Sequence, residues 1–306
     1  MMKSKDAAAP DPTAIGEISS PPFARLPDPA SLFAARAARL SQLADASGLA
    51  PYLNFLSGLT TAQHLIQADL PPPEGPDAQT LMRAHEFEMP PLHRNGIGDG
   101  EAIHAVIDRL FAAADAINKP AAAAEALRRV TAADREARLA MAESVLSGAL
   151  PADAIAEHIF VWAALQVHFA RLASVLDAAK LRPVADGICP ACGSMPASSM
   201  VVGWPGSHGA RFCCCSLCST LWHYVRIKCM LCGSTKGIAY SEIEDHGGTV
   251  KAETCDECHG WTKIFYQNKA PATEPIADDV ASLSLDLLMR EGSYRRGGFA
   301  PLLAGF

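Results

Sequence analysis

Apolar residues recur at helical spacing through the first half of the chain, where residues 29–183 contain no cysteine and are rich in Ala and Leu. Positions i, i+3, i+4 and i+7 stay apolar over several stretches that Gly or Pro separate, which is typical of amphipathic helices. We therefore expect an all-helical domain over these residues. The expected helices span about 29–47, 51–67, 77–85, 99–111, 120–130, 131–148 and 153–179.

For some of these helices the sequence also predicts the capping residue or the position in the bundle. Asp28, Asp99 and Thr131 are expected to cap helices, because their side-chain oxygens can accept hydrogen bonds from the first free amide groups. The helix at 153–179 is the longest, at roughly 40 Å, and it is apolar on more than one face. A helix with so little polar surface is usually central in a bundle or shared between two domains.

The second half of the chain changes to short β-prone runs with turn signals between them. A last amphipathic segment at 276–290 follows a proline-containing linker. A helix of that length is marginal alone, so we expect it to dock back on the rest of the chain. The β-prone runs are 200–202, 221–225, 238–240 and 263–266, and the turn signals are Pro205-Gly206 and Gly247-Gly248.

Length and composition restrict the class of protein. The chain has 306 residues, enough for two or three domains, and a net charge of −7. No apolar run reaches the roughly 18 residues that a membrane span needs. Residues 1–28 carry five prolines and lack the apolar core of a secretory signal. We expect a disordered Pro-rich arm at 1–28 and a cytoplasmic protein without a membrane partner.

All ten cysteines lie between residues 187 and 269, and eight of them form four Cys-x-x-Cys pairs. A shift of 40 residues carries the first two pairs onto the last two, and Cys-Gly-Ser at 192–194 recurs at 232–234. This spacing indicates one small unit duplicated in tandem. The pairs are Cys189/Cys192, Cys215/Cys218, Cys229/Cys232 and Cys255/Cys258.

A Cys-x-x-Cys turn, or knuckle, brings two thiolates to one metal ion, and two knuckles complete a tetrahedral four-sulfur site. Gly193 and Gly233 directly follow a pair and suit the positive φ that turns backbone N–H groups toward the sulfurs. Tight pairs without an export signal favour metal ligands over disulfides, which are the alternative. We expect all eight paired cysteines to bind two metal ions, zinc most often in such ribbons or a single iron at each site, which spacing does not separate.

The pairing of the knuckles leaves alternatives. A cross-brace would join the first pair to the third and the second to the fourth, whereas the duplication favours sequential pairing, in which each copy closes its own site. Cys213 and Cys214 have no cysteine 40 residues later, where Glu253 and Thr254 stand. We expect these two to be bystanders on the strand that enters a knuckle, with a redox or ligand-exchange role as the alternative.

Other functional classes find less support in the residues. Between 181 and 270, eight Lys or Arg stand against seven Asp or Glu, a balance of +1 that provides no basic stripe for nucleic acid. Trp204, Trp222 and Trp261 are expected in the core rather than under stacked bases. The chain has no Gly-rich phosphate loop or nucleophile elbow, so we expect no catalytic residues and no enzymatic activity.

Four segments occur in order: CPACGS at 189–194, CSLCSTLWHYVRIKC at 215–229, ETCDECHGW at 253–261, and ADDV with LDLLM between 277 and 289. Together they resemble the formate dehydrogenase accessory protein FdhE family, specifically from about 186 to 296 and by general layout over the helical half. The resemblance implies a cytoplasmic maturation factor that contacts the catalytic subunit of respiratory formate dehydrogenase before its export. It also implies rubredoxin-like iron at the eight paired cysteines.

The combined expectation is an α+β protein, with an all-helical N-terminal domain, two tandem rubredoxin-like or zinc-ribbon β subdomains and a C-terminal helix. We expect a non-catalytic accessory factor that binds the immature catalytic subunit of formate dehydrogenase. The alternatives are a redox-active iron protein that conditions the metal centre of its client, and a nucleic-acid-binding double zinc ribbon. The expected parts are the arm at 1–28, helical domain at 29–183, first ribbon at 184–226, second ribbon at 227–270, and linker with docking helix at 271–306.

Overall fold

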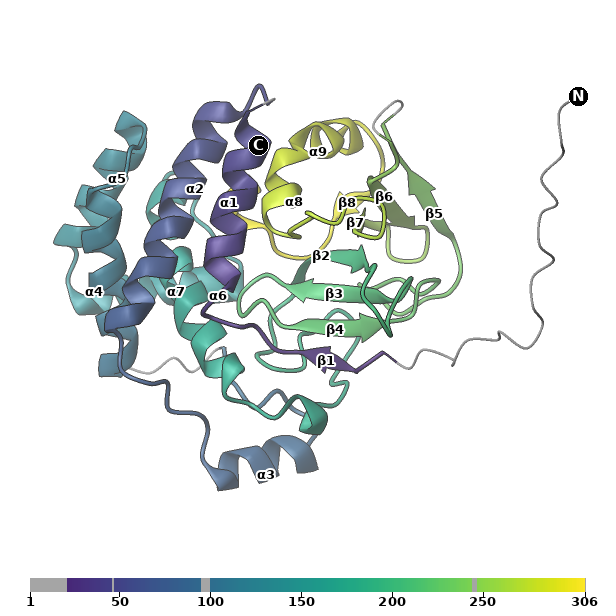
Figure 1. Cartoon of the computed structure of the whole chain (residues 1–306), viewed down its shortest axis with the longest axis horizontal. Helices are drawn as coiled ribbons and strands as arrows, with labels where there is room; N and C mark the ends of the chain where they lie inside the picture. The colour runs from purple at the N-terminus through teal and green to yellow at the C-terminus, as the bar shows by residue number, and fades with distance from the viewer. Residues whose placement is uncertain (1–20, 46, 95–99, 244–246, 306) are drawn as a thin grey trace, which may run out of the picture.

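The computed structural model describes residues 21–45, 47–94, 100–243 and 247–305. Helices gather on one side of the molecule and a sheet on the other, and the C-terminal helices lie over the sheet beside the first helix, α1 (Figure 1). The order of helical region, cysteine-bearing sheet and C-terminal helical segment is the one that the sequence predicts. The α+β fold class is therefore confirmed.

Helices form where the apolar spacing predicts them, and local signals set several of their ends. The carboxylate of Asp77 accepts a hydrogen bond from the amide of Thr80 at 2.6 Å and caps α3, and Gly148, with φ +78°, ends α6. The helices of this region are α1 (Leu32–Ala44), α2 (Ala50–Leu65), α3 (Ala78–Glu86), α4 (Glu101–Asp115), α5 (Ala121–Ala132), α6 (Arg135–Ser147) and α7 (Ile155–Ser174).

Two predicted helix starts are wrong. Thr131 lies inside α5, and Asp134 caps α6 instead, because its extended backbone lets the carboxylate accept from the amide of Ala137 at 2.8 Å. Asp28 closes the turn before α1, accepting hydrogen bonds from the Ala30 amide and the Ser31 hydroxyl, and the helix itself begins at Leu32. The predicted cap at Asp99 lies outside the described residues.

The helix α7 is the centre of the helical region, with α2, α4, α5 and α6 packed against it. It ends at Ser174, earlier than predicted, and a 3-10 turn at Ala178–Lys180 follows. Its buried residues face several directions, as a central helix requires. The buried set includes the polar side chain of Gln166.

The strands of both ribbons form one continuous mixed sheet rather than two separate ones. Its order is β1-β4-β3-β2-β7-β6-β5, in which β1 is Ala24–Arg25, with β8 beside β7. The two ribbons join where β2 and β7 pair in parallel, with Ser199 opposite Ile264. The strands are β2 (Pro196–Val201), β3 (Arg211–Cys215), β4 (Leu221–Tyr224), β5 (Ile238–Ser241), β6 (Val250–Cys255), β7 (Gly260–Tyr266) and β8 (Arg295–Arg296).

A short strand, β1 (Ala24–Arg25), lies at the edge of this sheet and pairs antiparallel with β4. The expected arm at 1–28 therefore does not extend to residue 28, and residues 1–20 lie outside the described part. The pairing forms because Ala24 is buried, the carbonyl of Phe23 accepts a hydrogen bond from His223 at 2.7 Å, and the Arg25 guanidinium stacks on Trp204. The sheet edge supplies hydrogen-bond partners that these residues would otherwise find in water.

A buried ion pair also joins the ribbons. Arg211 on β3 of the first ribbon donates to the carboxylate of Glu253 on β6 of the second at 2.8 Å, and both side chains are buried. The guanidinium also donates to Ser199 on β2 at 3.0 Å, so it spans the seam between the two copies. Burying a charge is tolerated only with such a partner.

The C-terminal segment was predicted as one helix that docks back on the rest of the chain. It forms two helices, α8 (Ala277–Ala281) and α9 (Leu283–Arg290), which are joined to the second ribbon by ion pairs. The ammonium of Lys263 on β7 lies 3.2 Å from Asp279 and 2.5 Å from Asp286, and Arg296 pairs with the same two carboxylates. This buried network of two cations and two anions fixes both helices. In the described part of the chain, no helix is long and apolar enough to cross a membrane.

Candidate metal centre

The eight paired cysteines gather into two groups of four, and within each group the sulfur atoms lie within 4.8 Å of one another. The first and second pairs meet, and so do the third and fourth, so the pairing is sequential and the cross-brace is wrong. All ten cysteines are free thiols, which excludes the disulfide alternative in this structure. The first cluster is Cys189, Cys192, Cys215 and Cys218; the second cluster is Cys229, Cys232, Cys255 and Cys258.

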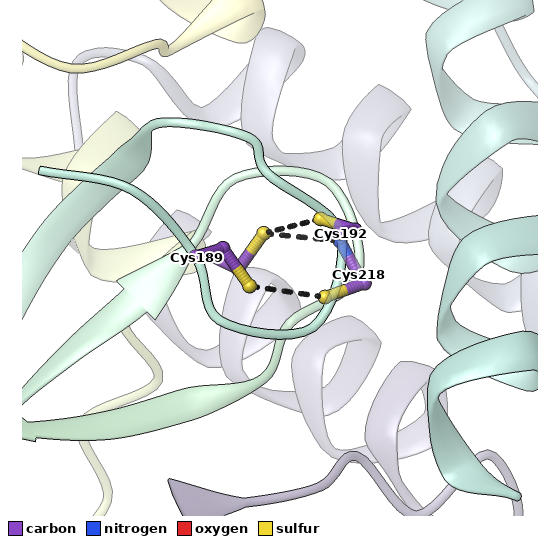
Figure 2. Close-up of side chains that lie close together, drawn as sticks. Cys189, Cys192 and Cys218 are labelled. Carbon is purple, nitrogen blue, oxygen red and sulfur yellow. Dashed lines mark hydrogen bonds between the residues drawn. The ribbon is translucent and has the colours of Figure 1, made fainter. Parts of the chain in front are cut away.

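The sulfur spacing in both clusters suits one four-coordinate metal ion. In the first cluster, the sulfur atoms of Cys189 and Cys218 are 3.6 Å apart and those of Cys192 and Cys215 are 3.4 Å apart. Figure 2 shows Cys189, Cys192 and Cys218 close together in this cluster. The corresponding distances in the second cluster are 3.9 and 3.8 Å. A tetrahedron with metal–sulfur distances of roughly 2.3 Å has edges of about 3.8 Å. The donor set and its spacing therefore fit a zinc or iron ion.

Each knuckle turns in the same way. The residue directly after the second cysteine of every pair has a positive φ: Gly193 at +77°, Gly233 at +75°, Ser219 at +59° and His259 at +52°. This turn points amide groups at sulfur, and the amides of Leu217 and Leu231, for example, donate to a cysteine sulfur of their own knuckle at 3.4 Å. Such donors stabilise thiolate, the form that binds metal.

Burial controls the ionisation of the free thiols. It raises the pKa of Cys189 and Cys215 well above the ordinary value of a thiol. Burial also opposes the ionisation of Cys218, but hydrogen bonds from the neighbouring thiols together lower its pKa. Without a cation, Cys189 and Cys215 are thus held as neutral thiols, and metal binding at these two ligands has to release their protons.

The first cluster lies in the main hydrophobic core, between the sheet and the helices. Two buried polar side chains from the helices hold its second knuckle. The amide of Gln166 on α7 donates to the carbonyl of Ser216 at 2.9 Å, and the guanidinium of Arg36 on α1 donates to the hydroxyl of Ser219 at 3.1 Å. Arg36 also donates to Gln166 and pairs with Glu274 at 3.0 Å. The helical region therefore positions this cluster directly.

The second cluster lies near the surface. Cys232 and Cys258 are exposed, whereas every cysteine of the first cluster is at most 1% exposed. Its first knuckle is held by partly exposed groups, since Asp186 accepts from Lys228 and from the hydroxyl of Tyr224, each at 2.6 Å. Solvent and other molecules can reach this cluster.

Other residues that the sequence singles out stay outside both clusters. Cys213 and Cys214 lie on β3 as predicted, are buried, and belong to neither group of four. Burial raises the pKa of the Cys213 thiol to about 12, and its sulfur faces the sulfur of Met230 at 3.7 Å. Trp222 and Trp261 are buried, which confirms their place in the core.

Sequence reasoning missed Arg36 and Gln166 as residues that hold a cluster. A signal was present, because each is a polar residue on an apolar stretch of its helix: Arg36 lies three residues after Phe33 and four before Leu40, and Gln166 precedes Val167. Such a position indicates a buried polar group with an unknown partner. The partners lie far along the chain, so spacing alone does not identify them.

Comparisons with known family models and sequences all give the same family. Family models described as "FdhE, N-terminal", "FdhE, central domain" and "FdhE, C-terminal domain" match residues 21–186, 188–226 and 227–303. A protein named FdhE homolog from Rhizobium meliloti (strain 1021) is 48% identical over 299 residues, 97% of this chain and 98% of that protein. An FdhE homolog from Stutzerimonas stutzeri (strain A1501) is 38% identical over 94% of this chain and 93% of its own length.

A solved structure agrees with the sequence relatives. The crystal structure of the FdhE protein from Pseudomonas aeruginosa superposes with a TM-score of 0.83 at 34% identity, covering 93% of this chain and 99% of that one. The similarity therefore includes the helical region, the sheet and the C-terminal helices together.

Proposed function

Because the chain belongs to the FdhE family, we propose that it is an accessory factor for the maturation of formate dehydrogenase that binds the immature catalytic subunit of that enzyme. The family is one of maturation factors, not of catalytic enzymes. The observation that carries the proposal is the pair of four-cysteine clusters with tetrahedral sulfur spacing, within a chain that matches its relatives over nearly its full length.

The metal part of the proposal assigns one mononuclear ion to each cluster. The ligands are Cys189, Cys192, Cys215 and Cys218 in the first and Cys229, Cys232, Cys255 and Cys258 in the second. Iron is proposed in both, from the family resemblance, and the four-thiolate geometry suits it as well as zinc. A bound iron would supply one-electron redox chemistry, and the protein's part is to hold four thiolates in fixed positions.

A deletion and complementation experiment tests the accessory role. A strain that lacks this gene is expected to lose formate dehydrogenase activity and to regain it with the wild-type gene. Cys258→Ala is expected to restore little activity, because it removes a sulfur of the second cluster. Cys213→Ala is the matched control, since it removes a buried thiol that lies outside both clusters. Normal activity in the deletion strain would reject the proposal, and capture of the catalytic subunit by the purified chain would support it directly.

Metal analysis separates iron from zinc. Protein purified without oxygen is expected to contain two iron ions per chain and to absorb visible light through its thiolate ligands. A colourless protein with two zinc ions would reject iron and restrict both clusters to a structural role. This outcome would leave the accessory role intact.

One observation favours a redox role as a second candidate. The second cluster has two exposed cysteines, so a bound iron there would lie close enough to the surface to exchange electrons with a client. A reversible absorbance change on adding dithionite and then ferricyanide is the expected result, and it should be smaller in Cys258→Ala, which keeps only the first cluster intact. The remaining parts of the proposal are a cytoplasmic location and no nucleic-acid partner, and the absence of salt-sensitive binding to DNA at low salt tests the latter.

A further inference from the structure

A cavity of about 580 Å³ lies between α9 and the C-terminal residues 292–304, on the face of the second ribbon. Its apolar lining includes Trp261 of β7, Leu283 of α9 and Leu303. None of the eight cluster cysteines lines this cavity, and the ion network that fixes the C-terminal helices supplies only part of its wall. A concave site with an apolar floor and a few charged groups at its wall is typical of a binding site.

The wall of this cavity is attached to the second knuckle of the second cluster. The amide of Arg295 donates to the carbonyl of His259 at 2.8 Å, and the amide of Gly297 donates to the carbonyl of Trp261 at 2.8 Å. The hydroxyl of Tyr294 donates to the carboxylate of Asp256, between Cys255 and Cys258, at 2.6 Å. The cavity and the exposed cluster therefore belong to one connected piece of structure.

The charges that line the cavity do not cancel. Asp286 and Arg296 belong to the buried network with Lys263 and Asp279, in which two cations meet two anions. Two further lining residues, Arg290 and Arg295, are exposed, and in the described part of the chain their guanidinium groups make no hydrogen bond or ion pair. The whole chain carries a net charge of −7, so this wall has the opposite sign to the molecule.

We propose that this cavity binds an acidic peptide segment with an apolar side chain, supplied by the client protein; this rests on the accessory function proposed above. The guanidinium groups of Arg290 and Arg295 suit carboxylates, which they can bind with paired hydrogen bonds. The apolar floor accommodates a side chain between the carboxylates. Leu287, 48% exposed, lies one helical turn from both Leu283 and Arg290 on α9.

The experiment measures binding of full-length protein to two probes: the separately purified catalytic subunit of formate dehydrogenase, free of its cofactors, and a fluorescein-labelled peptide of alternating Glu and Leu. The test variant is the double charge reversal Arg290→Glu with Arg295→Glu. Arg128→Glu, at an exposed arginine of α5 in the helical region, is the matched control. Circular dichroism and metal content establish that each variant is folded.

We expect both probes to bind wild type and Arg128→Glu, and the double reversal to weaken both by about 10- to 100-fold, as loss of two charge-assisted contacts implies. Binding should also weaken with added salt. Equal binding of the catalytic subunit to wild type and the double reversal overturns the inference and leaves the accessory function standing.

The peptide separates failure of the inference from failure of the accessory function. If the catalytic subunit does not bind wild type, the accessory function is rejected, and peptide binding that the double reversal abolishes still supports the acidic specificity of the cavity. A Lys/Leu peptide that binds as well as the Glu/Leu peptide overturns that specificity. A single-stranded oligonucleotide that displaces the Glu/Leu peptide and binds more tightly than it does overturns the assignment of a protein ligand.

Discussion

The two cysteine clusters share their spacing, backbone turns and sulfur geometry, yet their surroundings differ. Sulfur–sulfur distances are 3.4–3.6 Å in the first cluster and 3.8–3.9 Å in the second. The first cluster is enclosed by helices that bond to its second knuckle, whereas the second exposes Cys232 and Cys258. The repeat determines the local geometry of a site, and the rest of the chain determines how accessible and how essential that site is.

This difference in burial indicates different roles for the two clusters. The cysteines of the first belong to the same hydrophobic core as the helices, so a metal ion there stabilises the junction between the helical region and the sheet. The second cluster contributes no cysteine to that core and lies beside the cavity that Arg290 and Arg295 line. We therefore expect the first cluster to support the fold and the second to face the client.

The largest expected difference between the clusters is the loss of thermal stability when one cysteine ligand is removed from each. Cys189→Ser should lower the thermal midpoint by more than about 10 °C and reduce solubility, because structural metal sites contribute on the order of 10–16 kcal/mol, comparable to the stability of a whole domain. Cys232→Ser should lower the midpoint by less than about 5 °C. Each variant should retain one metal ion per chain. Elemental analysis measures the metal content, and thermal unfolding followed by circular dichroism measures the midpoints. Equal losses of stability in the two variants would contradict the assignment.

The polar groups that hold the first cluster should contribute more to the free energy of unfolding than those that hold the second. Arg36→Met removes a buried guanidinium that contacts Glu274, Gln166 and Ser219, so we expect a loss of about 3 kcal/mol in the free energy of unfolding. Lys228→Met breaks a partly exposed pair with Asp186 beside the second cluster and should cost less than about 1 kcal/mol. Urea unfolding measures both. If Lys228→Met loses as much unfolding free energy as Arg36→Met, the polar groups beside the two clusters do not differ in their contribution to stability.

The parts of this arrangement that sequence predicts are those set by local chemistry. Apolar periodicity located the helices, and Cys-x-x-Cys spacing with its repeat located both groups of four, because a knuckle forms from consecutive residues. The positive φ at Gly193 and Gly233 was also predictable, since only a turn of that kind points amides at sulfur. Ser219 and His259 adopt the same conformation without a glycine to indicate it.

Contacts between distant segments were not predictable in this way. The parallel pairing of β2 with β7 makes one sheet from two ribbons, and it depends on Ser199 and Ile264, which no local pattern connects. The two-residue strand β1 is too short for an alternating pattern. The unequal exposure of the clusters also follows from tertiary packing, because the duplicated sequences of the two units are similar at the knuckles themselves.

Acid should weaken the helical region that encloses the first cluster. Burial, together with the nearby Arg171, lowers the pKa of His168 on α7 from its ordinary value of 6.5 to about 4. The unfolded chain therefore binds a proton between pH 6.5 and 4 that the folded chain does not, so this contribution to stability is present above pH 6.5 and is lost as the pH falls toward 4. One pKa unit corresponds to about 1.4 kcal/mol, so we expect this histidine to account for up to about 3 kcal/mol of the acid-dependent loss.

The variant His168→Gln isolates that contribution, since glutamine does not titrate. Urea unfolding of wild type and variant at pH 8, 6, 5 and 4 is the measurement. The difference between the two proteins should be constant near pH 8 and should shift in favour of the variant as the pH falls. A difference that stays constant over the whole range would exclude His168 as the group responsible.

The smallest expected effect compares the two non-glycine residues that follow a second cysteine, Ser219 at φ +59° and His259 at φ +52°. His259→Gly removes a side chain from a left-handed conformation at an exposed position and should stabilise the fold by about 0.5–1 kcal/mol. Ser219→Gly gains the same backbone freedom but leaves Arg36 without the hydroxyl that it contacts, so we expect no gain or a net loss. Chemical unfolding of both variants with metal bound measures the pair. Equal gains would mean that the bond from Arg36 contributes nothing to the first cluster, because the turns themselves are the same in both copies.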